Sequence, residues 1–333
     1  MHEDDAMQAT AGFRRPLRAR SAVVSCLVVG LSIAVVMQWS SRRDDASVVG
    51  TMPSAANAAA STPAGGTEAD PFVAPVDAPG HRATDSPRAQ AVARLRREFE
   101  ASSDLFDYAQ RLVPAVRSGD AEATWLMSRV ADYCAGYAND PAGFARDTRL
   151  LAGMDLPAAP AMTEARDRLG ARCRRFSASD GLSPSFVRQL RLSAAQAGSL
   201  VAEAELLAMD RPLATDDAYE RGLVDRIGRS GDADAFGALA NEAGAFDWLA
   251  SIEPDIAPQY RSLVLQLAAC RLGKECGPGS TLMTSYCVNG GICSRNPEQG
   301  FEEFVYDAAI PRQSAEMVRS AVAALVDRFG GQR

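Results

Sequence analysis

Residues 117–123 read Arg-Ser-Gly-Asp-Ala-Glu-Ala, and residues 229–235 read Arg-Ser-Gly-Asp-Ala-Asp-Ala. A weaker third copy surrounds Gly198. Glycine tolerates the left-handed backbone that ends a helix, so it lets the chain reverse between two helices. The pattern therefore predicts a helix–turn–helix unit at Gly119, Gly198 and Gly231.

The residues around each glycine indicate which helix face is buried. Alanine stands four residues after each glycine and a larger apolar residue stands eight after it, while another small or apolar residue stands four before it. Positions four apart share one helix face, so the alanine permits close approach of a neighbouring helix and the larger residue fills the next groove. The residues that follow the three glycines are Ala123, Met127, Ala202, Leu206, Ala235 and Leu239.

The rest of the chain after residue 87 also has a helical pattern. Apolar residues recur with a 3.6-residue period, and no stretch alternates long enough to predict a strand. Pro114 lies inside one such pattern and is expected to kink that helix or to move its start. The predicted helices cover 88–101, 104–117, 120–136, 141–152, 161–176, 184–197, 199–209, 215–229, 232–244, 257–273, 279–287, 299–308 and 313–329.

This pattern resembles tetratricopeptide-like repeats, and more closely their Sel-one-like variety, whose signature is Ala-Ala-x-x-Gly-x-x-x-Ala-x-x-x-Leu. The best match is residues 194–198 followed by Ala202 and Leu206, and the resemblance covers residues 100–245. Gly198 and Gly231 lie 33 residues apart, close to the ~34-residue period of such arrays. The 79 residues between Gly119 and Gly198 leave room for two units and an insertion.

The chain also departs from the signature. Leu207 stands where a glycine usually follows the leucine, and the usual downstream tyrosine is missing or displaced, with Tyr133 the nearest in the first copy. The resemblance therefore implies an all-α fold built as an irregular array of antiparallel helix pairs, an α-α superhelix without regular stacking. A non-repeating, alanine-rich helical bundle is the alternative.

A run without charge near the start, Ala22 to Trp39, reads AVVSCLVVGLSIAVVMQW. Its 18 residues would span about 27 Å as a helix, close to the roughly 30 Å hydrocarbon core of a membrane. Four arginines precede it and two follow it, which favours an N-terminus in the cytoplasm. A cleaved signal peptide is the alternative, but the apolar run is longer than usual and no good cleavage site follows it.

These features predict four regions in a bacterial inner-membrane protein with a single transmembrane helix. The segment after the apolar run is rich in Ala, Pro, Gly, Ser and Thr, so it is expected to be a disordered linker. All but one of the 35 basic residues are arginine, which indicates a GC-rich bacterial genome. The regions are a cytoplasmic tail (1–21), the transmembrane helix (22–39), the linker (40–87) and a periplasmic domain (88–333).

Six of the seven cysteines lie in the predicted periplasmic domain, where an oxidising environment permits disulfides. Cys134 and Cys173 stand apart from the others and are predicted to pair. The last four follow a C-x5-C-x10-C-x5-C pattern, for which the pairing stays open and which is too widely spaced for a usual zinc site. These four are Cys270, Cys276, Cys287 and Cys293.

Residues for most enzyme chemistry are absent from the predicted domain. The two histidines, His2 and His81, lie in the tail and the linker, which excludes histidine-based triads, relays and metal ligation within the domain. No phosphate-binding or dinucleotide-binding motif occurs, so no cofactor is expected. The net charge is −7 with signs interspersed and no basic stripe, so nucleic acid is not an expected partner.

The sequence thus favours a binding or scaffolding module over an enzyme, with another envelope protein or a peptide as its partner. One alternative is a cell-wall glycan hydrolase that uses two carboxylates, for which Glu302, Glu303 and Asp307 form the densest acidic group. A solvated helix face over buried aromatic residues is the favoured explanation of that group. A structural accessory subunit is a further alternative. Trp125, Trp248, Phe106 and Phe236 are expected in the core.

Overall fold

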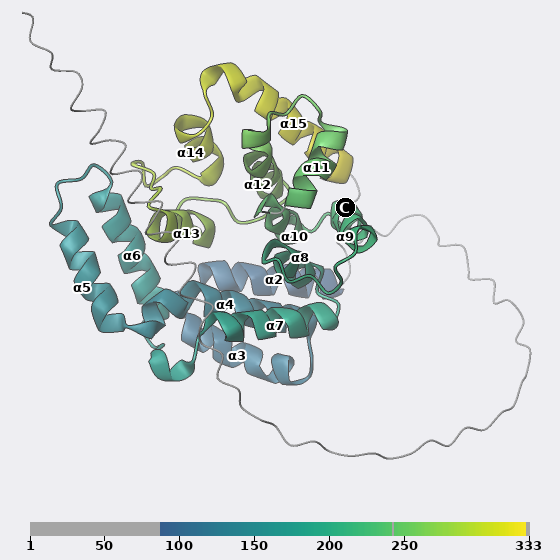
Figure 1. Cartoon of the computed structure of the whole chain (residues 1–333). Helices are drawn as coiled ribbons and strands as arrows, with labels where there is room; N and C mark the ends of the chain where they lie inside the picture. Colours follow the sequence, from purple (N-terminus) through teal and green to yellow (C-terminus); the bar gives the residue numbers. More distant parts are fainter. Residues whose placement is uncertain (1–86, 242, 331–333) are drawn as a thin grey trace, which may run out of the picture. The chain divides into compact units, whose positions relative to one another are not determined.

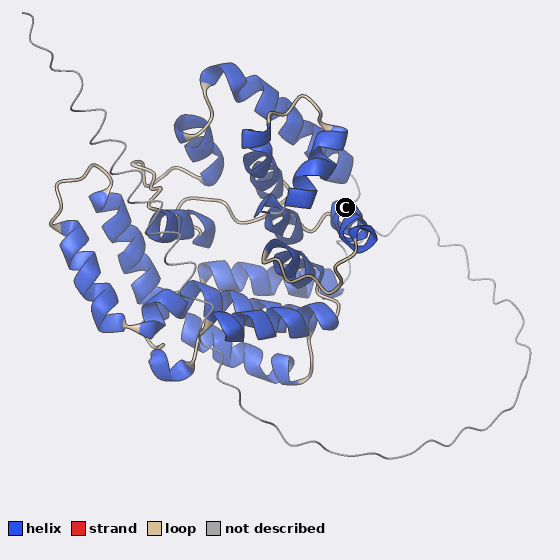
Figure 2. Cartoon of the chain, viewed as in Figure 1, coloured by secondary structure: helices blue, strands red, loops and turns tan. Residues whose placement is uncertain are grey.

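The computed structural model describes residues 87–241 and 243–330, without the side chains of residues 243–246. Every regular element in this part of the chain is a helix, as Figure 2 shows, and it contains no strand. The prediction of an all-α domain is therefore confirmed. The predicted tail and transmembrane helix, and the predicted linker up to residue 86, lie outside the described residues. Among the described helices, none is long and apolar enough to span a bilayer.

Fourteen α-helices and three short 3-10 helices make up the described chain. The α-helices are α2 (Pro87–Ala101), α3 (Leu105–Arg117), α4 (Ala121–Asn139), α5 (Pro141–Ala152), α6 (Ala159–Cys173), α7 (Pro184–Gln196), α8 (Leu200–Ala208), α9 (Asp217–Ser230), α10 (Ala233–Ala238), α11 (Ala243–Ile252), α12 (Arg261–Arg271), α13 (Thr281–Gly290), α14 (Phe301–Ala308) and α15 (Arg312–Gly330). The 3-10 helices are η2 (Ala178–Asp180), η3 (Leu239–Asn241) and η4 (Pro258–Tyr260).

Each motif glycine joins two helices. Gly119, Gly198 and Gly231 have φ of +81°, +95° and +63°, and they connect α3 to α4, α7 to α8 and α9 to α10. In the turns at Gly119 and Gly198, the N–H of the residue after the glycine donates to a carbonyl on the preceding helix, at 3.0 and 2.9 Å. The acceptor is the alanine that stands four residues before the glycine. This closure of the helix end uses the left-handed glycine and leaves the next residue as the N-cap of the following helix.

The N-cap residues explain where these second helices begin. Asp120, Ser199 and Asp232 directly follow the three glycines, and each side chain accepts hydrogen bonds from backbone N–H groups of the first turn. Such bonds satisfy donors that a helix start otherwise leaves unpaired. The helix–turn–helix prediction at each glycine is therefore confirmed locally.

The motif alanines lie in the core. Ala123, Ala202 and Ala235 are all 0% exposed, and Leu206 and Leu239 at the next position are almost equally buried. Met127 packs against the core from a partly buried position. Small side chains at these points let neighbouring helices approach closely, as the sequence pattern predicts.

The helices pack as a continuous series. α4 lies against α3 and α7, α8 lies against α7 and α10, and α12 lies against α10 and α15. α5 and α6 form a hairpin beside this series (Figure 1), and it is inserted between α4 and α7. The hairpin occupies the interval between Gly119 and Gly198.

One boundary prediction is wrong. The predicted helix 232–244 breaks at η3, which packs against α12, and an additional helix, α11, follows. The apolar pattern continues across the break, so periodicity alone does not locate it. The predicted helix 104–117 agrees with α3, which begins after its cap Asp104. Of the two expectations for Pro114, a moved helix start is not observed, because Pro114 lies in the last turn.

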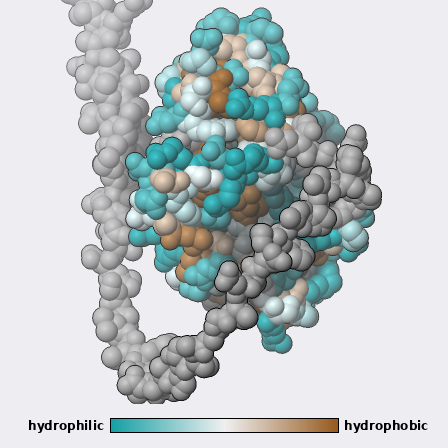
Figure 3. All heavy atoms as spheres, turned by 90° about the vertical axis from the view of Figure 1, so that its right-hand side faces the viewer, coloured by the Kyte–Doolittle hydropathy of each residue, from teal (hydrophilic) through white to brown (hydrophobic). Residues whose placement is uncertain are grey.

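Three disulfides stabilise the domain. The predicted pair Cys134–Cys173 links α4 to the end of α6, and the last four cysteines pair in order as Cys270–Cys276 and Cys287–Cys293. Trp125 and Phe236 are buried as predicted, whereas Phe106 and Trp248 pack against the core from partly buried positions. On the face in Figure 3, hydrophilic residues surround small apolar patches.

Candidate functional site

A cleft of about 970 Å³ opens between α2, α4, the start of α10 and the loop after α12. Its size is in the range of pockets that bind organic ligands. α2 forms one wall along its length, and α4 contributes Trp125, Leu126 and Arg129. Residues 230–234, 272, 273, 275 and 278–280 line the rest. The well-preserved motif copy at Gly231 therefore contributes directly to the cleft.

The guanidinium of Arg96, on α2, binds both well-preserved motif copies at once. Its Nε donates to Glu122 Oε1 at 2.6 Å and its Nη2 to Glu122 Oε2 at 3.0 Å. The same group donates to Asp232 at 2.8 and 3.0 Å and to Asp234 at 3.2 Å. Glu122 and Asp234 are both the second residue of their helices, three residues after a motif glycine. One side chain of α2 thus ties α4 to α10.

Aromatic packing fixes this arginine. The Arg96 guanidinium carbon lies 4.9 Å from the centroid of the buried Trp125 ring. The indole N–H of Trp125 donates to Glu205 Oε2 on α8 at 3.1 Å. A guanidinium held over an aromatic face gains cation–π attraction and loses freedom to rotate. The arrangement therefore orients the donors of Arg96 toward the carboxylates.

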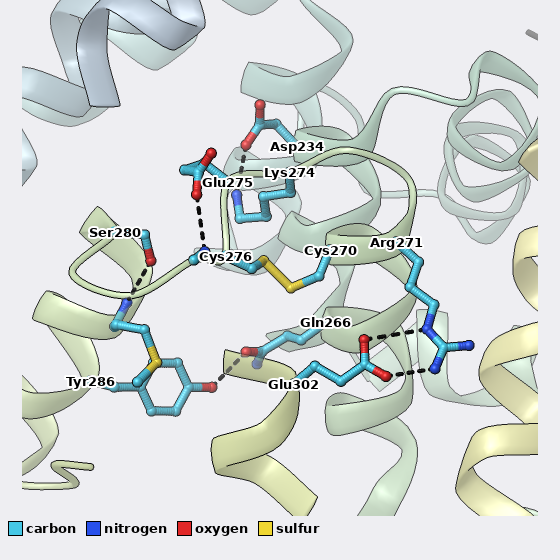
Figure 4. The surroundings of a disulfide bond; sticks show 12 residues. Asp234, Gln266, Cys270, Arg271, Lys274, Glu275, Cys276, Ser280, Tyr286 and Glu302 are labelled. Carbon is cyan, nitrogen blue, oxygen red and sulfur yellow. Dashed lines mark hydrogen bonds and ion pairs between the residues drawn. A yellow bond between two sulfur atoms is a disulfide. The ribbon is translucent and has the colours of Figure 1, made fainter. Parts of the chain in front are cut away.

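Lys274 completes the cluster from the opposite side. It belongs to the loop closed by the Cys270–Cys276 disulfide, and its Nζ lies 2.6 Å from Asp234 Oδ1 (Figure 4). The neighbouring Glu275 accepts from the N–H of Gly277 at 3.0 Å. The disulfide restricts the conformations of this loop. It therefore restrains both Lys274 and the part of the cleft wall that the loop forms.

Burial and charge act against each other on the carboxyl groups. Burial alone would raise the pKa of Asp234, but the charges of Lys274, Arg96 and Arg129 outweigh burial and lower this pKa to about 2. For Glu122, burial dominates over the hydrogen bonds from Arg96, and the nearby Asp232 and Asp234 add repulsion, so its pKa is raised. Three carboxylates share one guanidinium here, which explains why one of them keeps a raised pKa.

Arg129 is the other inner cation of the cleft. Its guanidinium lies 5.5 Å from the Phe99 ring centroid and 5.6 Å from that of Trp125. Burial opposes its charge, but Glu205, Asp234 and Glu100 together raise its pKa, so it stays a cation. Its nearest carboxylate oxygen, Glu205 Oε1, is 3.9 Å away, which is too long for a hydrogen bond.

Of the residues that the sequence singles out, most lie outside the cleft. Gly231 lines the cleft, whereas the motif alanines and leucines are core residues. Glu302 pairs with Arg271 at 2.5 Å, as Figure 4 shows, and Asp307 accepts from Gln299. Neither these two nor Glu303 lines the cleft. Within the described residues, no group of three histidine, cysteine or acidic side chains is placed to hold a metal ion.

No sequence pattern indicates Arg96, Arg129 or Lys274 as residues of a site. One signal was available, because an acidic residue stands at the same place in both well-preserved motif copies, as Glu122 and Asp234. Two buried acids in equivalent positions require a cation, although the sequence does not show that α2 provides it.

No family model, curated protein or solved structure matches this chain.

Proposed function

We propose that this chain is a binding module of the bacterial envelope that holds a peptide segment of another envelope protein in the cleft between α2, α4 and α10. The observation that carries this proposal is the cleft itself, about 970 Å³ in volume and lined by both aromatic and charged side chains. Peptide-binding grooves combine apolar surface for affinity with a few fixed polar groups for orientation.

The proposed architecture is an irregular tetratricopeptide-like or Sel-one-like array. Three helix pairs joined at Gly119, Gly198 and Gly231 support it, as does the series of packed helices from α3 to α15. Stacked helix pairs leave concave surfaces along their length, and proteins with such repeats commonly bind partners there. The assignment to this class rests on analogy of architecture.

The proposed location is the periplasmic side of the inner membrane, with residues 22–39 as the anchor. Three disulfides support an oxidising compartment, because cytosolic thiols are normally kept reduced. A reporter that is active only in the periplasm, fused after Arg333, tests this orientation. An inactive reporter on a protein that accumulates normally would contradict it.

A photo-crosslinking experiment tests the binding function. A photoreactive amino acid replaces Ala93, which lines the cleft on α2, in the full-length chain expressed in a bacterial envelope. The control places it at Glu316 on α15, whose side chain is 88% exposed and lies outside the cleft. We expect one partner segment to be captured from position 93 and not from 316. A synthetic peptide of that segment should then compete with capture.

Equal capture from both positions, or a captured segment whose peptide does not compete, would contradict the binding proposal. The hydrolase alternative is tested in the same preparation with purified cell-wall glycan. Glu303→Ala combined with Asp307→Ala should leave peptide capture unchanged if the chain is a binding module. A hydrolytic activity that these two changes abolish would favour the enzyme instead.

A further inference from the structure

We propose that Arg129 binds a carboxylate of the peptide held in the cleft. This inference rests on the proposed binding function and adds the chemical class of the ligand. The acidic groups that line the cleft are hydrogen-bonded within the fold, whereas Arg129 makes no hydrogen bond to any described residue and has only a 3.9 Å contact with the Glu205 carboxylate.

The four acidic side chains of the cleft wall all have partners. Asp232 and Asp234 bind Arg96, and Asp234 also binds Lys274. Glu100 accepts from the N–H and the hydroxyl of Thr281, at 3.0 and 2.6 Å, at the start of α13. Glu275 accepts from a backbone N–H of its own loop. A ligand cation would therefore have to displace bonds that the fold already makes.

Arg129 differs from these groups. Its side chain is 21% exposed, lines the cleft and makes no hydrogen bond to any described residue. Glu205, its nearest carboxylate, lies within 2.7 Å of Arg191 Nε and also accepts from the Trp125 indole. A guanidinium carries five N–H donors in a planar fork that matches a carboxylate. Arg129 thus offers donors without hydrogen-bond partners among the described residues inside the cleft.

The aromatic neighbours of Arg129 strengthen this assignment. Phe99 and Trp125 lie within cation–π distance of the guanidinium, so little of its surface remains for solvent. A partly desolvated cation binds an anion more strongly than an exposed cation does, because water competes less. At the rim, Arg88 and Arg97 are exposed and form no ion pair with described residues, which favours approach of an anionic segment.

The total charge of the cleft does not by itself select an anion. Glu122, Asp232 and Asp234 carry one more charge than their two partners, Arg96 and Lys274. A ligand is therefore selected by the free hydrogen-bond donors of Arg129 and by the rim arginines. A carboxylate can come from an Asp or Glu side chain or from a peptide's C-terminus. The chemistry at Arg129 is the same for both, and the experiment distinguishes them.

The probe is a synthetic library of random decapeptides, biotinylated at the N-terminus and made in two forms, with a free or an amidated C-terminus. The library is bound to the full-length chain in detergent. We expect bound peptides to be enriched in Asp and Glu, or to require the free C-terminus. Amidation abolishes binding if the C-terminal carboxylate is the ligand and has little effect if a side-chain carboxylate is.

Three variants test whether Arg129 is responsible. Arg129→Gln should weaken binding of the selected peptides at least about tenfold, because a charged hydrogen bond to the peptide is lost. Arg129→Lys keeps the charge without the planar fork, so an intermediate loss is expected, and it replaces Arg129→Gln if that variant does not fold. Arg111→Gln is the control: Arg111 also lies against an aromatic ring, 5.6 Å from Tyr108, but outside the cleft.

Two outcomes would overturn the inference. One is that the bound peptides show no preference for a carboxylate; the other is that the Arg129 variants bind the same peptides as tightly as the Arg111 variant does. In either case the cleft still binds peptide, so the proposed function stands. If the unmodified chain captures no peptide from either form of the library, both proposals fail.

Discussion

Glu122 and Asp234 occupy the same position in two copies of one sequence motif, and both carboxylates bind the guanidinium of Arg96. The two residues lie at the starts of α4 and α10, helices that are far apart in the sequence. The motif therefore does more than reverse the chain, because it places two acids where a single arginine of α2 binds both. This arginine and Asp234 line the cleft.

Replacing Arg96 should destabilise the domain strongly. Arg96→Ala leaves Glu122, Asp232 and Asp234 close together with Lys274 as their remaining ion-pair partner, and removing one partner of a largely buried pair costs about 3 kcal/mol. Urea unfolding of the full-length chain measures this free energy. Arg97→Ala, next on the same helix and exposed, is the control and should change it by less than about 0.5 kcal/mol. Similar losses in both variants would contradict the role of Arg96.

The Asp234 carboxylate should make stability depend on pH in the acid range. Its folded pKa of about 2 is below its ordinary value of 3.8, so its contribution is complete above pH 3.8 and is lost as the pH falls through 2. The shift corresponds to about 2 kcal/mol. Between pH 4.5 and 2, the unmodified chain should therefore lose about 2 kcal/mol more of unfolding free energy than Asp234→Asn.

Lys274 provides a second test of the same group. Lys274→Met removes the cation that lowers the Asp234 pKa most, so the acid loss of stability should move to higher pH. The measurement is the pH dependence of the unfolding free energy of Lys274→Met, compared with that of the unmodified chain. An unchanged pH profile in Lys274→Met would show that the ion pair does not set the pKa of Asp234.

The three disulfides should differ in their resistance to reduction. Both sulfurs of Cys134–Cys173 belong to residues that are 0% exposed, whereas Cys270, Cys276 and Cys293 are partly exposed. Under native conditions with mild reductant, alkylation followed by mass spectrometry should find Cys134–Cys173 intact after the other two have opened. Labelling of Cys134 before Cys270 would contradict this order.

The same disulfides should also differ in their effect on stability. Cys134–Cys173 spans 39 residues and Cys270–Cys276 spans 6. Restricting the unfolded chain is worth about 4 kcal/mol for the longer loop and about 2 kcal/mol for the shorter one. Paired cysteine-to-alanine variants, compared by chemical unfolding, should show this ranking. The variant without Cys270–Cys276 should also bind peptide more weakly, because Lys274 and the cleft wall lose their restraint.

The motif alanines should not tolerate larger side chains. Ala202→Leu inserts three carbon atoms into a site that is 0% exposed, and overpacking of this kind costs about 1–3 kcal/mol. Ala197→Leu, at the exposed end of α7, is the matched control and should have little effect. Comparable thermal stability of the two variants would mean that the alanine of the motif is not needed for helix packing.

Local features of this fold follow from the sequence alone. The positive φ of Gly119, Gly198 and Gly231, the N-caps after them and the burial of the alanines depend on residues within a few positions, so the motif predicts them. Three disulfides followed from an even number of cysteines in a predicted oxidising compartment. The break between α10 and α11 did not follow, because the apolar period continues across it and packing of η3 on α12 decides where the helix ends.

The cleft depends on the tertiary structure. The motif places Glu122 and Asp234 at two helix starts, but only packing brings these starts together, with Arg96 of α2 between them and Lys274 opposite. No sequence pattern points to Arg129, because its proposed role depends on which acceptors lie within hydrogen-bond distance of its guanidinium in the folded chain. Local conformation is set by neighbours in the chain, whereas electrostatic pairing depends on through-space distances between residues more than a hundred positions apart, and the fold alone sets those distances.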